Sequence, residues 1–377
     1  MIRVRNDMAS SKRITCAVTV ACLALTAACS DSNNSPEPVV GPARAPFQEL
    51  IDQGVTRYLG DYSPMATETQ GDVVNHNFGA GDGPLCLDGS EFTMATRDKG
   101  SDELVIFLQG GGACFSELCA ATQSAAKGIP KAGILDPDLA ANPVADWNTV
   151  YIPYCDGGLH ASDRDSDSDG DGRIDRFQRG LHNLSASLDV AVKTFPAPKR
   201  ILLTGISAGG FGTTWALPLV RHLYPGVPIE LVNDSGVGVA RTDKPEFIRL
   251  LLNDWNMGAF LPASCPTCIG ADGHLTDVHK WQLAEDDKLR LSMMSYTRDT
   301  VIPFFTRVSA EEFERELRAE MADVENVYPE RMRSFITAGA NHTFLLSDTS
   351  ITAGGVSVLD WVTAMLDGSA DWVSTSD

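Results

Sequence analysis

The sequence predicts an α/β protein with a mainly parallel central sheet flanked by helices. Three observations carry this prediction: short and continuously apolar segments, amphipathic segments between them, and small or polar residues directly after the apolar ones. Continuous apolar runs are typical of strands that are buried on both faces in a parallel sheet. Strands that alternate with helices indicate parallel crossover connections. The composition, with 43% apolar and 21% charged residues, is that of an ordinary globular protein.

The predicted strands follow one another along the chain with helices between most of them. The strand segments are 104–108, 148–152, 200–203, 229–232, 289–296 and 333–337. The helix segments are 181–195, 211–223, the stretch behind the capping box Ser309–Glu312, and 355–366. Although 377 residues could hold two domains, α/β proteins of this length are often one domain with insertions, so we predict a single domain over residues 47–377.

The N-terminus carries the pattern of an export signal. Basic residues precede an apolar run over 14–25 that is too short for a spanning helix, so residues 1–28 are the predicted signal peptide of a bacterial lipoprotein. The small residues before Cys29 resemble a lipobox, so we predict cleavage before Cys29 and acylation of its side chain. Ser30 favours the outer membrane of the cell envelope as the destination. Simple cleavage and secretion is the alternative, because Thr26 is unusual at its lipobox position.

Residues 29–46 are rich in Pro, Ser and Asn and lack apolar periodicity, so we predict a disordered tether between the lipid anchor and the domain. Membrane contact is expected only through that anchor. The formal net charge of −20 argues against nucleic acid and against a strongly anionic polymer as partner. No feature of the sequence points to a particular oligomeric state.

The cysteines predict disulfides. Three of the nine lie in the signal or at its cleavage site, which leaves Cys86, Cys114, Cys119, Cys155, Cys265 and Cys268. An even number in an oxidising compartment favours three disulfide bonds. A zinc site is the alternative, but Cys265 and Cys268 form the only C-x-x-C pair and no second pair accompanies them at zinc-ribbon spacing.

A serine stands between glycines directly after the apolar run 200–203. The stretch Thr204–Gly210 reads TGISAGG, which predicts a strand, a sharp turn with Ser207 at its apex, and the start of a helix. In a G-x-S-x-G turn the glycines leave room for a crowded backbone, so that the serine hydroxyl stands exposed above the sheet. Ser207 is therefore the predicted nucleophile of a serine hydrolase.

A glycine-rich loop follows the predicted strand 104–108. It reads QGGGAC over Gln109–Cys114. Because glycine has no side chain, the N–H groups of Gly111 and Gly112 can approach a substrate closely. Together with the N–H group of Ala208, they form the predicted oxyanion hole. A flexible turn is the alternative use of such glycines.

The catalytic acid and base should follow the nucleophile in the order acid, then histidine, each after a strand. The histidines downstream of Ser207 are His222, His274, His279 and His342. Only His342 follows a late predicted strand in a loop of small residues, so it is the predicted base. Asp299, after the strand 289–296, is the predicted acid. Asp234 also ends a predicted strand, but its expected role is to bond amides in the turn beside Ser207.

Residues 163–178 contain a dense acidic loop. Three aspartates and Gly172 occupy positions 1, 3, 5 and 6 of a calcium-binding loop, although position 12 is Gln178 rather than Glu and no helix is predicted before Asp163. The predicted ligands of a structural calcium ion are Asp167, Asp169, Asp171 and Asp175. A solvated acidic loop is the alternative, and no catalytic role is expected. No cofactor is predicted for catalysis.

Several short motifs occur together in one order along the chain. They are CLDGS at Cys86–Ser90, FLQGGG at Phe107–Gly112 with Cys114, YCDG at Tyr154–Gly157, Arg179–Gly180, GISAGG at Gly205–Gly210, DSG at Asp234–Gly236 and Asn341–His342. In this order they resemble the pectin acetylesterase and Notum family, over most of residues 80–345. The resemblance implies an α/β-hydrolase fold and a carboxylesterase that removes acyl groups from hydroxyls. One branch removes acetyl from pectin, the other a lipid acyl group from a signalling protein.

The resemblance also implies roles for particular residues. It implies the triad Ser207, Asp299 and His342, the oxyanion donors Gly111, Gly112 and Ala208, and the disulfides Cys86–Cys155 and Cys114–Cys119, which leaves Cys265 with Cys268. The family commonly has Trp near Ala113 and Glu at Gln109, so the acyl pocket is expected to differ here.

The predicted function is that of a serine carboxylesterase acting on O-acyl esters, with acetyl as the predicted acyl group. The acidic loop and the net charge make polygalacturonate a poor substrate, whereas a neutral acetylated saccharide or a small ester is physically easier. The alternatives are a lipase-like or peptidase-like serine hydrolase, and a surface binding protein that has kept an inactive hydrolase fold.

Overall fold

The computed structural model describes residues 44–377 apart from residues 80 and 82. Its contacts group Arg44–Asp377 into one compact unit. The predicted signal, the predicted lipidation site Cys29 and residues 29–43 of the predicted tether lie outside the described residues. Within the described part of the chain, none of the helices is long and apolar enough to cross a membrane.

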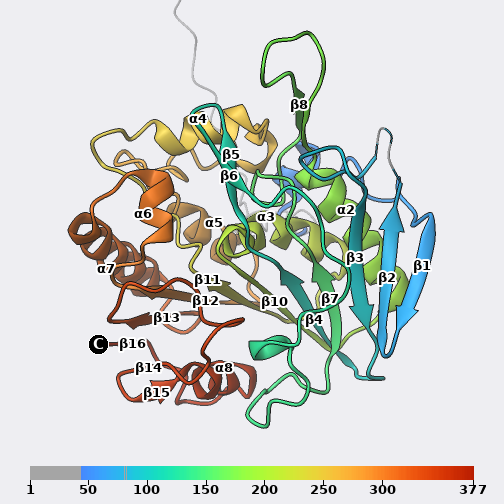
Figure 1. The fold of residues 1–377 in the computed structure, drawn as a ribbon. Helices are drawn as coiled ribbons and strands as arrows, with labels where there is room; N and C mark the ends of the chain where they lie inside the picture. The colour runs from blue at the N-terminus through green and yellow to red at the C-terminus, as the bar shows by residue number, and fades with distance from the viewer. Residues whose placement is uncertain (1–43, 80, 82) are drawn as a thin grey trace, which may run out of the picture. The chain divides into compact units, whose positions relative to one another are not determined.

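A ten-stranded sheet runs through the unit (Figure 1). In spatial order its strands are β1 (Ala66–Gln70), β2 (Val73–Phe78), β3 (Phe92–Arg97), β7 (Asn148–Ile152), β4 (Glu103–Leu108), β10 (Arg200–Ile206), β11 (Ile229–Asp234), β12 (Leu289–Tyr296), β13 (Met332–Thr337) and β16 (Thr375–Ser376). The strands from β7 to β16 are parallel, and β1, β2, β3 and β7 pair antiparallel. The predicted α/β fold with a mainly parallel sheet is confirmed.

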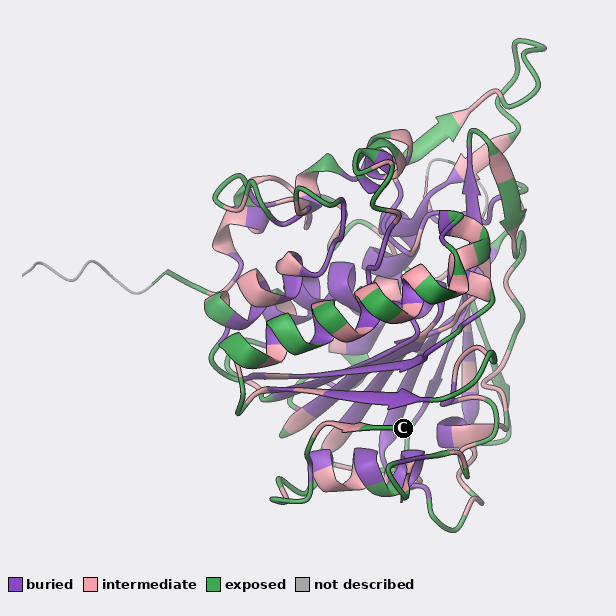
Figure 2. Cartoon of the chain, turned by 90° about the vertical axis from the view of Figure 1, so that its left-hand side faces the viewer, coloured by how far each residue is buried: buried purple, intermediate pink, exposed green. Residues whose placement is uncertain are grey.

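Side chains that alternate along each strand build a core on both faces of the sheet. On β4, Ile106 and Leu108 pack with helices α2 (Gly180–Thr194), α3 (Ala208–Leu223) and α7 (Ala310–Val327). Val105 and Phe107 point to the other face, where they pack with α8 (Val358–Leu366). Figure 2 shows the strands almost entirely buried between these two helical layers. Because both faces are covered, the strands read as continuous apolar runs.

The last helix is shorter than predicted. It begins at Val358 rather than residue 355, because Gly354 and Gly355 both have positive φ and form the turn between β14 (Thr352–Ala353) and β15 (Val356–Ser357). The Ser357 side chain accepts a hydrogen bond from the N–H of Asp360 and caps the helix. The predicted cap of α7 is confirmed, since Ser309 accepts from the N–H of Glu312.

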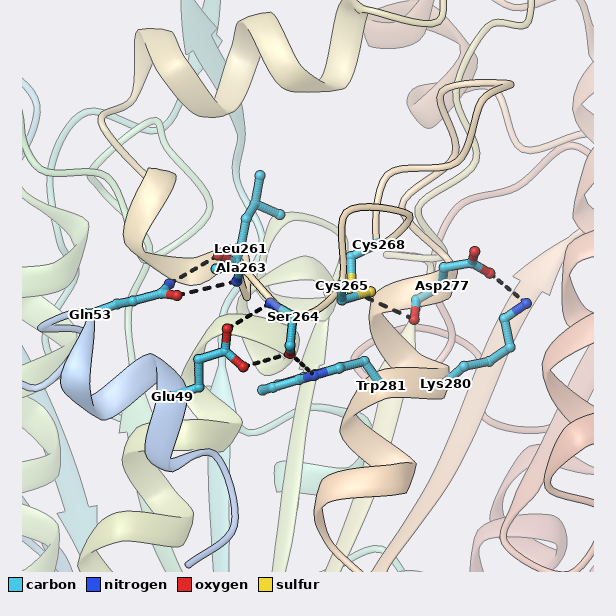
Figure 3. Close-up of a disulfide and its surroundings, with 10 residues drawn as sticks. All are labelled: Glu49, Gln53, Leu261, Ala263, Ser264, Cys265, Cys268, Asp277, Lys280 and Trp281. Atoms are coloured by element: carbon cyan, nitrogen blue, oxygen red, sulfur yellow. Dashed lines mark hydrogen bonds and ion pairs between the residues drawn. A yellow bond between two sulfur atoms is a disulfide. The ribbon is translucent and has the colours of Figure 1, made fainter. Parts of the chain in front are cut away.

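A long insertion separates β11 from β12. It contains α4 (Phe247–Asp254), a 3₁₀ turn at Gly258–Phe260 and α5 (Asp277–Glu285), none of which the sequence analysis predicted. Figure 3 shows how helix α1 (Gln48–Asp52) and the residue after it hold the middle of the insertion. Glu49 accepts from the N–H and hydroxyl of Ser264 at 2.7 and 2.5 Å, and Gln53 donates to the carbonyl of Leu261 at 2.9 Å. These bonds fix the segment that carries the disulfide Cys265–Cys268.

All three disulfides implied by the family resemblance are present. They join Cys86 to Cys155, Cys114 to Cys119 and Cys265 to Cys268. The first links the segment before β3 to the loop after β7, and the second spans the hairpin of β5 (Gly112–Phe115) and β6 (Leu118–Ala121). In the third, the two sulfurs of the C-x-x-C pair are bonded to each other, so they do not form a zinc site.

Candidate active site

Ser207 lies between the end of β10 and the start of α3, at the carboxyl edge of the parallel sheet. Its backbone has φ 56° and ψ −120°, a strained conformation for a residue with a side chain. Position 209, two residues after Ser207, requires glycine because a Cβ there would collide with the carbonyl oxygen of Leu108. The strand, sharp turn and helix predicted around Ser207 are therefore present.

His342 and Asp299 lie in the loops after β13 and β12, and they contact each other directly. Nδ1 of His342 is 2.6 Å from Oδ2 of Asp299, whose side chain is fully buried. The other carboxylate oxygen accepts the N–H groups of Val301 and Ile302 at 2.8 and 3.0 Å. An ionised carboxylate only accepts, so the Nδ1 atom carries the proton and the Nε2 atom presents its lone pair.

The Nε2 atom of His342 is buried and has no hydrogen-bond partner among the described residues. A buried acceptor without a partner is costly in a folded protein, and such groups often have a catalytic use. This atom is therefore free to take a proton from a hydroxyl or from a substrate. Asp299 fixes the tautomer that makes this possible.

Asp234 does not have the role expected from the sequence. Instead of bonding amides within its own turn, its Oδ2 atom accepts the N–H groups of Phe344 and Leu345, at 2.7 and 2.8 Å. These two residues belong to the loop that carries His342. The carbonyl of Asp234 accepts the N–H of Ser207 at 2.7 Å. The expectation of a purely local role was wrong because β10, β11, β12 and β13 are neighbours in the sheet, so their loops meet.

The glycine-rich loop packs against the nucleophile. A Cβ at Gly110 would lie 2.8 Å from the Cβ of Ser207, so only glycine allows this approach. The carbonyl of Gly111 accepts the N–H of Thr122 at 2.8 Å, and in a planar trans peptide the N–H of Gly112 then points the opposite way. Tyr154 donates its hydroxyl to the carbonyl of Gly112 at 2.9 Å and holds the next peptide.

Ala208 is the first residue of α3. The first N–H groups of a helix lack intrahelical partners and carry the positive end of the helix dipole. The loop and this helix start both adjoin Ser207, so their backbone N–H groups are candidate donors of an oxyanion hole.

A cavity of about 60 Å³ opens at Ser207 and is lined almost entirely by apolar side chains. Its wall includes Ala113, Phe115, Trp215, Phe247, Leu251 and Ile302. Trp215 comes from α3, Phe247 and Leu251 from α4, and Ile302 from α6 (Val301–Thr306). The sequence did not lead us to predict these side chains as part of the site. The spacing of Phe247, Leu251 and Leu252 is that of one apolar helix face and could have indicated the helix that carries them.

The acidic loop forms the end of a hairpin between β8 (Arg164–Ser166) and β9 (Arg176–Gln178), which projects from the body of the protein (Figure 1). The carboxylate oxygens of Asp167, Asp169 and Asp171 lie within 4.8 Å of one another. Asp175 instead accepts hydrogen bonds from the N–H and hydroxyl of Ser168 at 2.7 and 2.8 Å. Three of the four predicted ligands are therefore grouped together, in a loop flanked by strands.

A second group, Asp272, His274 and Glu320, also brings three possible metal ligands within 4.8 Å. The N–H of Ala240 donates to Nδ1 of His274 at 3.0 Å. In neutral histidine the proton is then on Nε2, which leaves no nitrogen lone pair for a metal. This group is better described as a buried N–H donor facing carboxylates than as a metal site.

Part of the chain is similar to known proteins. Residues 69–251 match the model of a family described as Pectinacetylesterase. The chain is 32% identical over 170 residues to pectin acetylesterase 4 of Arabidopsis thaliana, which is 41% of each chain. It is 32% identical over 178 residues to the palmitoleoyl-protein carboxylesterase notum1 of Xenopus laevis, covering 40% of this chain and 34% of that protein.

These matches span well under half of the relatives' own lengths. The segment 69–251 contains Ser207 and the glycine-rich loop, whereas Asp299 and His342 lie beyond it. Mouse NOTUM, a palmitoleoyl-protein carboxylesterase, is similar to a lesser degree, with 28% identity over 171 residues, or 40% of this chain and 33% of its own. Over this segment, the chain is similar to the pectinacetylesterase and Notum families of carboxylic ester hydrolases.

Proposed function

We propose that the protein is a serine carboxylesterase that hydrolyses O-acyl esters through an acyl-enzyme on Ser207. The observation that carries the proposal is the pair formed by His342 and Asp299, 2.6 Å apart, with the buried Nε2 of His342 left unpartnered. Ser207 lies at the elbow beside a glycine-rich loop and at the mouth of an apolar cavity. Nucleophile, base, orienting acid and oxyanion donors together are the parts that acyl transfer needs.

In this mechanism the Nε2 atom of His342 takes the proton of the Ser207 hydroxyl as its oxygen attacks the ester carbonyl. Backbone N–H groups of Gly111, Gly112 and Ala208 bind the oxyanion that develops. The imidazolium, held by Asp299, returns the proton to the leaving alcohol. Water then repeats the sequence, with His342 as base, and releases the carboxylic acid and free Ser207.

The cavity supports an acyl group longer than acetyl. One methyl group needs about as much room as a water molecule, and a water needs only about 10 to 15 Å³ of such volume. A cavity of about 60 Å³ therefore has room for several carbon atoms beyond the carbonyl. The alcohol part is proposed to be neutral, because the net charge of −20 disfavours an anionic polymer. An acylated saccharide fits both conditions.

The test uses a fluorophosphonate probe together with p-nitrophenyl acetate, butyrate, octanoate and palmitate. We expect the probe to label Ser207, Ser207→Ala to abolish labelling and turnover, and butyrate or octanoate to exceed acetate in kcat/KM. Ser187→Ala is the matched control, because Ser187 is a buried serine that donates to the carbonyl of Asn183 within α2. Labelling that persists in Ser207→Ala contradicts the proposal, and a folded wild-type protein with no turnover favours the binding-protein alternative.

Acetylated xylan, acetylated pectin and a peptide substrate distinguish the remaining alternatives. Release of acetate from xylan but not from pectin agrees with a neutral substrate. Preference for palmitate over all shorter esters would instead indicate a lipase, and cleavage of the peptide a peptidase.

The three disulfides and the family support export from the cytoplasm. We propose in addition that the exported protein is lipid-anchored in the cell envelope through Cys29. Fractionation of cells that express the wild-type protein and Cys29→Ser tests this. The wild-type protein is expected with the membranes and the variant in the soluble exported fraction, whereas a soluble wild-type protein contradicts the anchor and supports secretion.

We also propose that Asp167, Asp169 and Asp171 hold a structural calcium ion. Their closely grouped carboxylates support this, since calcium prefers oxygen ligands in flexible arrangements. The ion would stabilise the hairpin tip and take no part in catalysis.

A further inference from the structure

Asp234 stands at the end of β11, between the strand that carries Ser207 and the strand that leads to Asp299. Resting on the proposed esterase function, we infer that Asp234 is a positioning residue that holds the Ser207 elbow and the His342 loop in one rigid frame. It does not touch the imidazole through any hydrogen bond in the described part of the chain, so it acts through the backbone of its neighbours.

One residue bonds both catalytic loops. The main-chain carbonyl of Asp234 accepts the N–H of Ser207 at 2.7 Å. Its Oδ2 atom accepts the N–H groups of Phe344 and Leu345, which are 110 and 111 positions away in the sequence. Hydrogen bonds to a buried carboxylate are about twice as strong as neutral ones. Asp234 therefore links the Ser207 elbow to the His342 loop through its own backbone and side chain.

Ser235 extends the frame to strand β12, which leads to Asp299. Its hydroxyl donates to Oδ1 of Asp234 at 2.9 Å and accepts the N–H of Thr343 at 3.3 Å. Its own N–H donates to the carbonyl of Met294 at 2.9 Å, on the strand that leads to Asp299. The N–H groups of three consecutive residues after His342 are thus held by Asp234 and Ser235.

Three of the eight described non-glycine residues with positive φ belong to this frame. Ser207, Ser235 and Thr343 have φ of 56°, 64° and 63°, in the left-handed region that favours glycine. A β-branched residue such as Thr343 is rarely found there. Strained residues persist only where the surrounding structure determines them, and they gather at functional sites. The hydrogen bonds from Phe344 and Leu345 to Asp234 hold the backbone next to Thr343. Without the Asp234 carboxylate, the strained backbone of Thr343 can relax, and this relaxation would shift His342, which is the preceding residue.

Burial of the Asp234 carboxylate is unfavourable for the free energy of folding. Asp234 is fully buried, and burial raises its pKa to about 6 although Leu345, Phe344 and Ser235 donate to it. Burial therefore makes the ionised form less favourable than it is in water, although a group with a pKa of about 6 is still mostly ionised at pH 7. A buried charged group does not by itself indicate a contribution to stability, because proteins in which well-packed neutral groups replace such a charge are often equally stable. Its retention at the meeting point of the catalytic loops fits a positioning role.

The experiment compares Asp234→Ala with Asp234→Asn in the full-length protein, using p-nitrophenyl butyrate and measuring kcat and KM per folded enzyme. Asp234→Ala removes the acceptor of both amides, so we expect kcat to fall about 100-fold, the effect of a displacement of about 1 Å, with KM changed less than about threefold. In Asp234→Asn the amide oxygen can take the place of Oδ2 and its NH₂ group can donate to Ser235, so kcat should stay within about tenfold of wild type.

Asp286→Ala is the matched control. Asp286 is also a buried carboxylate and pairs with Arg221 at 2.6 Å, but it precedes β12 at the opposite edge of the sheet. This variant should lower Tm while kcat per folded enzyme stays at the wild-type value. Should Asp234→Ala fail to fold, Ser235→Ala replaces it, with an expected fall in kcat of about tenfold because Thr343 loses its acceptor.

The inference is overturned if Asp234→Ala, or Ser235→Ala in its place, keeps the wild-type kcat per folded enzyme. It is also overturned if Asp234→Asn is as inactive as Asp234→Ala, because rescue by the neutral acceptor is what positioning requires. Failure of the proposed function appears differently, as a wild-type protein that the phosphonate probe does not label at Ser207.

Discussion

Asp299 and His342 are joined by a 2.6 Å contact in which only one carboxylate oxygen of Asp299 takes part. The other oxygen is committed to the N–H groups of Val301 and Ile302 at the start of α6. This division of the carboxylate fixes the orientation of its plane before any substrate binds. The orientation in turn selects the proton position on the His342 ring.

Asp299→Asn should therefore be nearly inactive while remaining folded. The two N–H groups of residues 301 and 302 require an oxygen, so the asparagine NH₂ group must face Nδ1 of His342. That contact forces the proton onto Nε2, which can then no longer accept the proton of Ser207. We expect kcat for p-nitrophenyl butyrate to fall by about 10⁴-fold, with the wild-type circular dichroism spectrum. Activity within tenfold of wild type would show that another residue orients the base.

Ala113→Phe tests the acyl pocket. Ala113 lies in the cavity wall beside the glycine-rich loop, and a phenyl ring there fills space that a longer chain needs. Exclusion of two methylene groups costs about 1.6 kcal/mol at about 0.8 kcal/mol each, which lowers the ratio of kcat/KM for octanoate to that for acetate about 15-fold. The rate with acetate is the internal control, because damage to the oxyanion loop would lower both substrates equally. An unchanged ratio means that the acyl chain lies elsewhere.

The sheet could be predicted because a parallel strand that is buried on both faces leaves a continuous apolar run, as in β4, and because apolar and polar residues alternate along β12. The order of the proposed catalytic residues followed from the same pattern, because each lies in the turn or loop after a predicted strand. β1 was not predictable in this way, since all five of its residues are exposed and it carries no apolar pattern.

The acyl cavity and the role of Asp234 could not be predicted, because both depend on contacts between distant segments. Trp215 and Ile302 line one cavity although they are 87 positions apart in the sequence. The amides that Asp234 accepts lie 110 positions away, and no local pattern marks them. Local propensity predicts a turn at Asp234, whereas the meeting of adjacent sheet loops determines what its side chain contacts.

Calcium should raise the melting temperature of the wild-type protein. Binding at 100 times Kd stabilises the folded state by about 2.7 kcal/mol, which corresponds to at least a few degrees for a domain of this size. The double variant Asp167→Ala, Asp169→Ala should lose the response, because it removes two of the three grouped carboxylates. Magnesium at the same concentration is the control, since it dehydrates reluctantly and demands octahedral geometry. Equal melting temperatures with calcium and with EDTA would indicate a solvated loop.

Asp163 should make the stability of the protein depend on acidic pH. The side chains of His182 and Arg57 lie 2.9 and 2.7 Å from its carboxylate oxygens, and Tyr58 also donates to it. Burial by itself raises the pKa of Asp163, but the hydrogen bonds from His182 and Arg57 outweigh burial and lower the pKa to about 2. Because Arg57 and Tyr58 belong to the N-terminal segment, this carboxylate holds that segment to α2.

A carboxylate whose pKa is lower in the folded state stabilises the protein above its unfolded pKa, and this stabilisation is lost as pH falls through the folded value. Asp163→Asn should therefore lower the free energy of unfolding by about 2 kcal/mol at pH 7 and by only about 1 kcal/mol at pH 3, measured by urea denaturation. Asp61→Asn, an exposed carboxylate on the same segment, is the control and should show no such pH-dependent difference. An equal loss at both pH values for Asp163→Asn would mean that the contact depends on shape and hydrogen bonding and owes nothing to the charge.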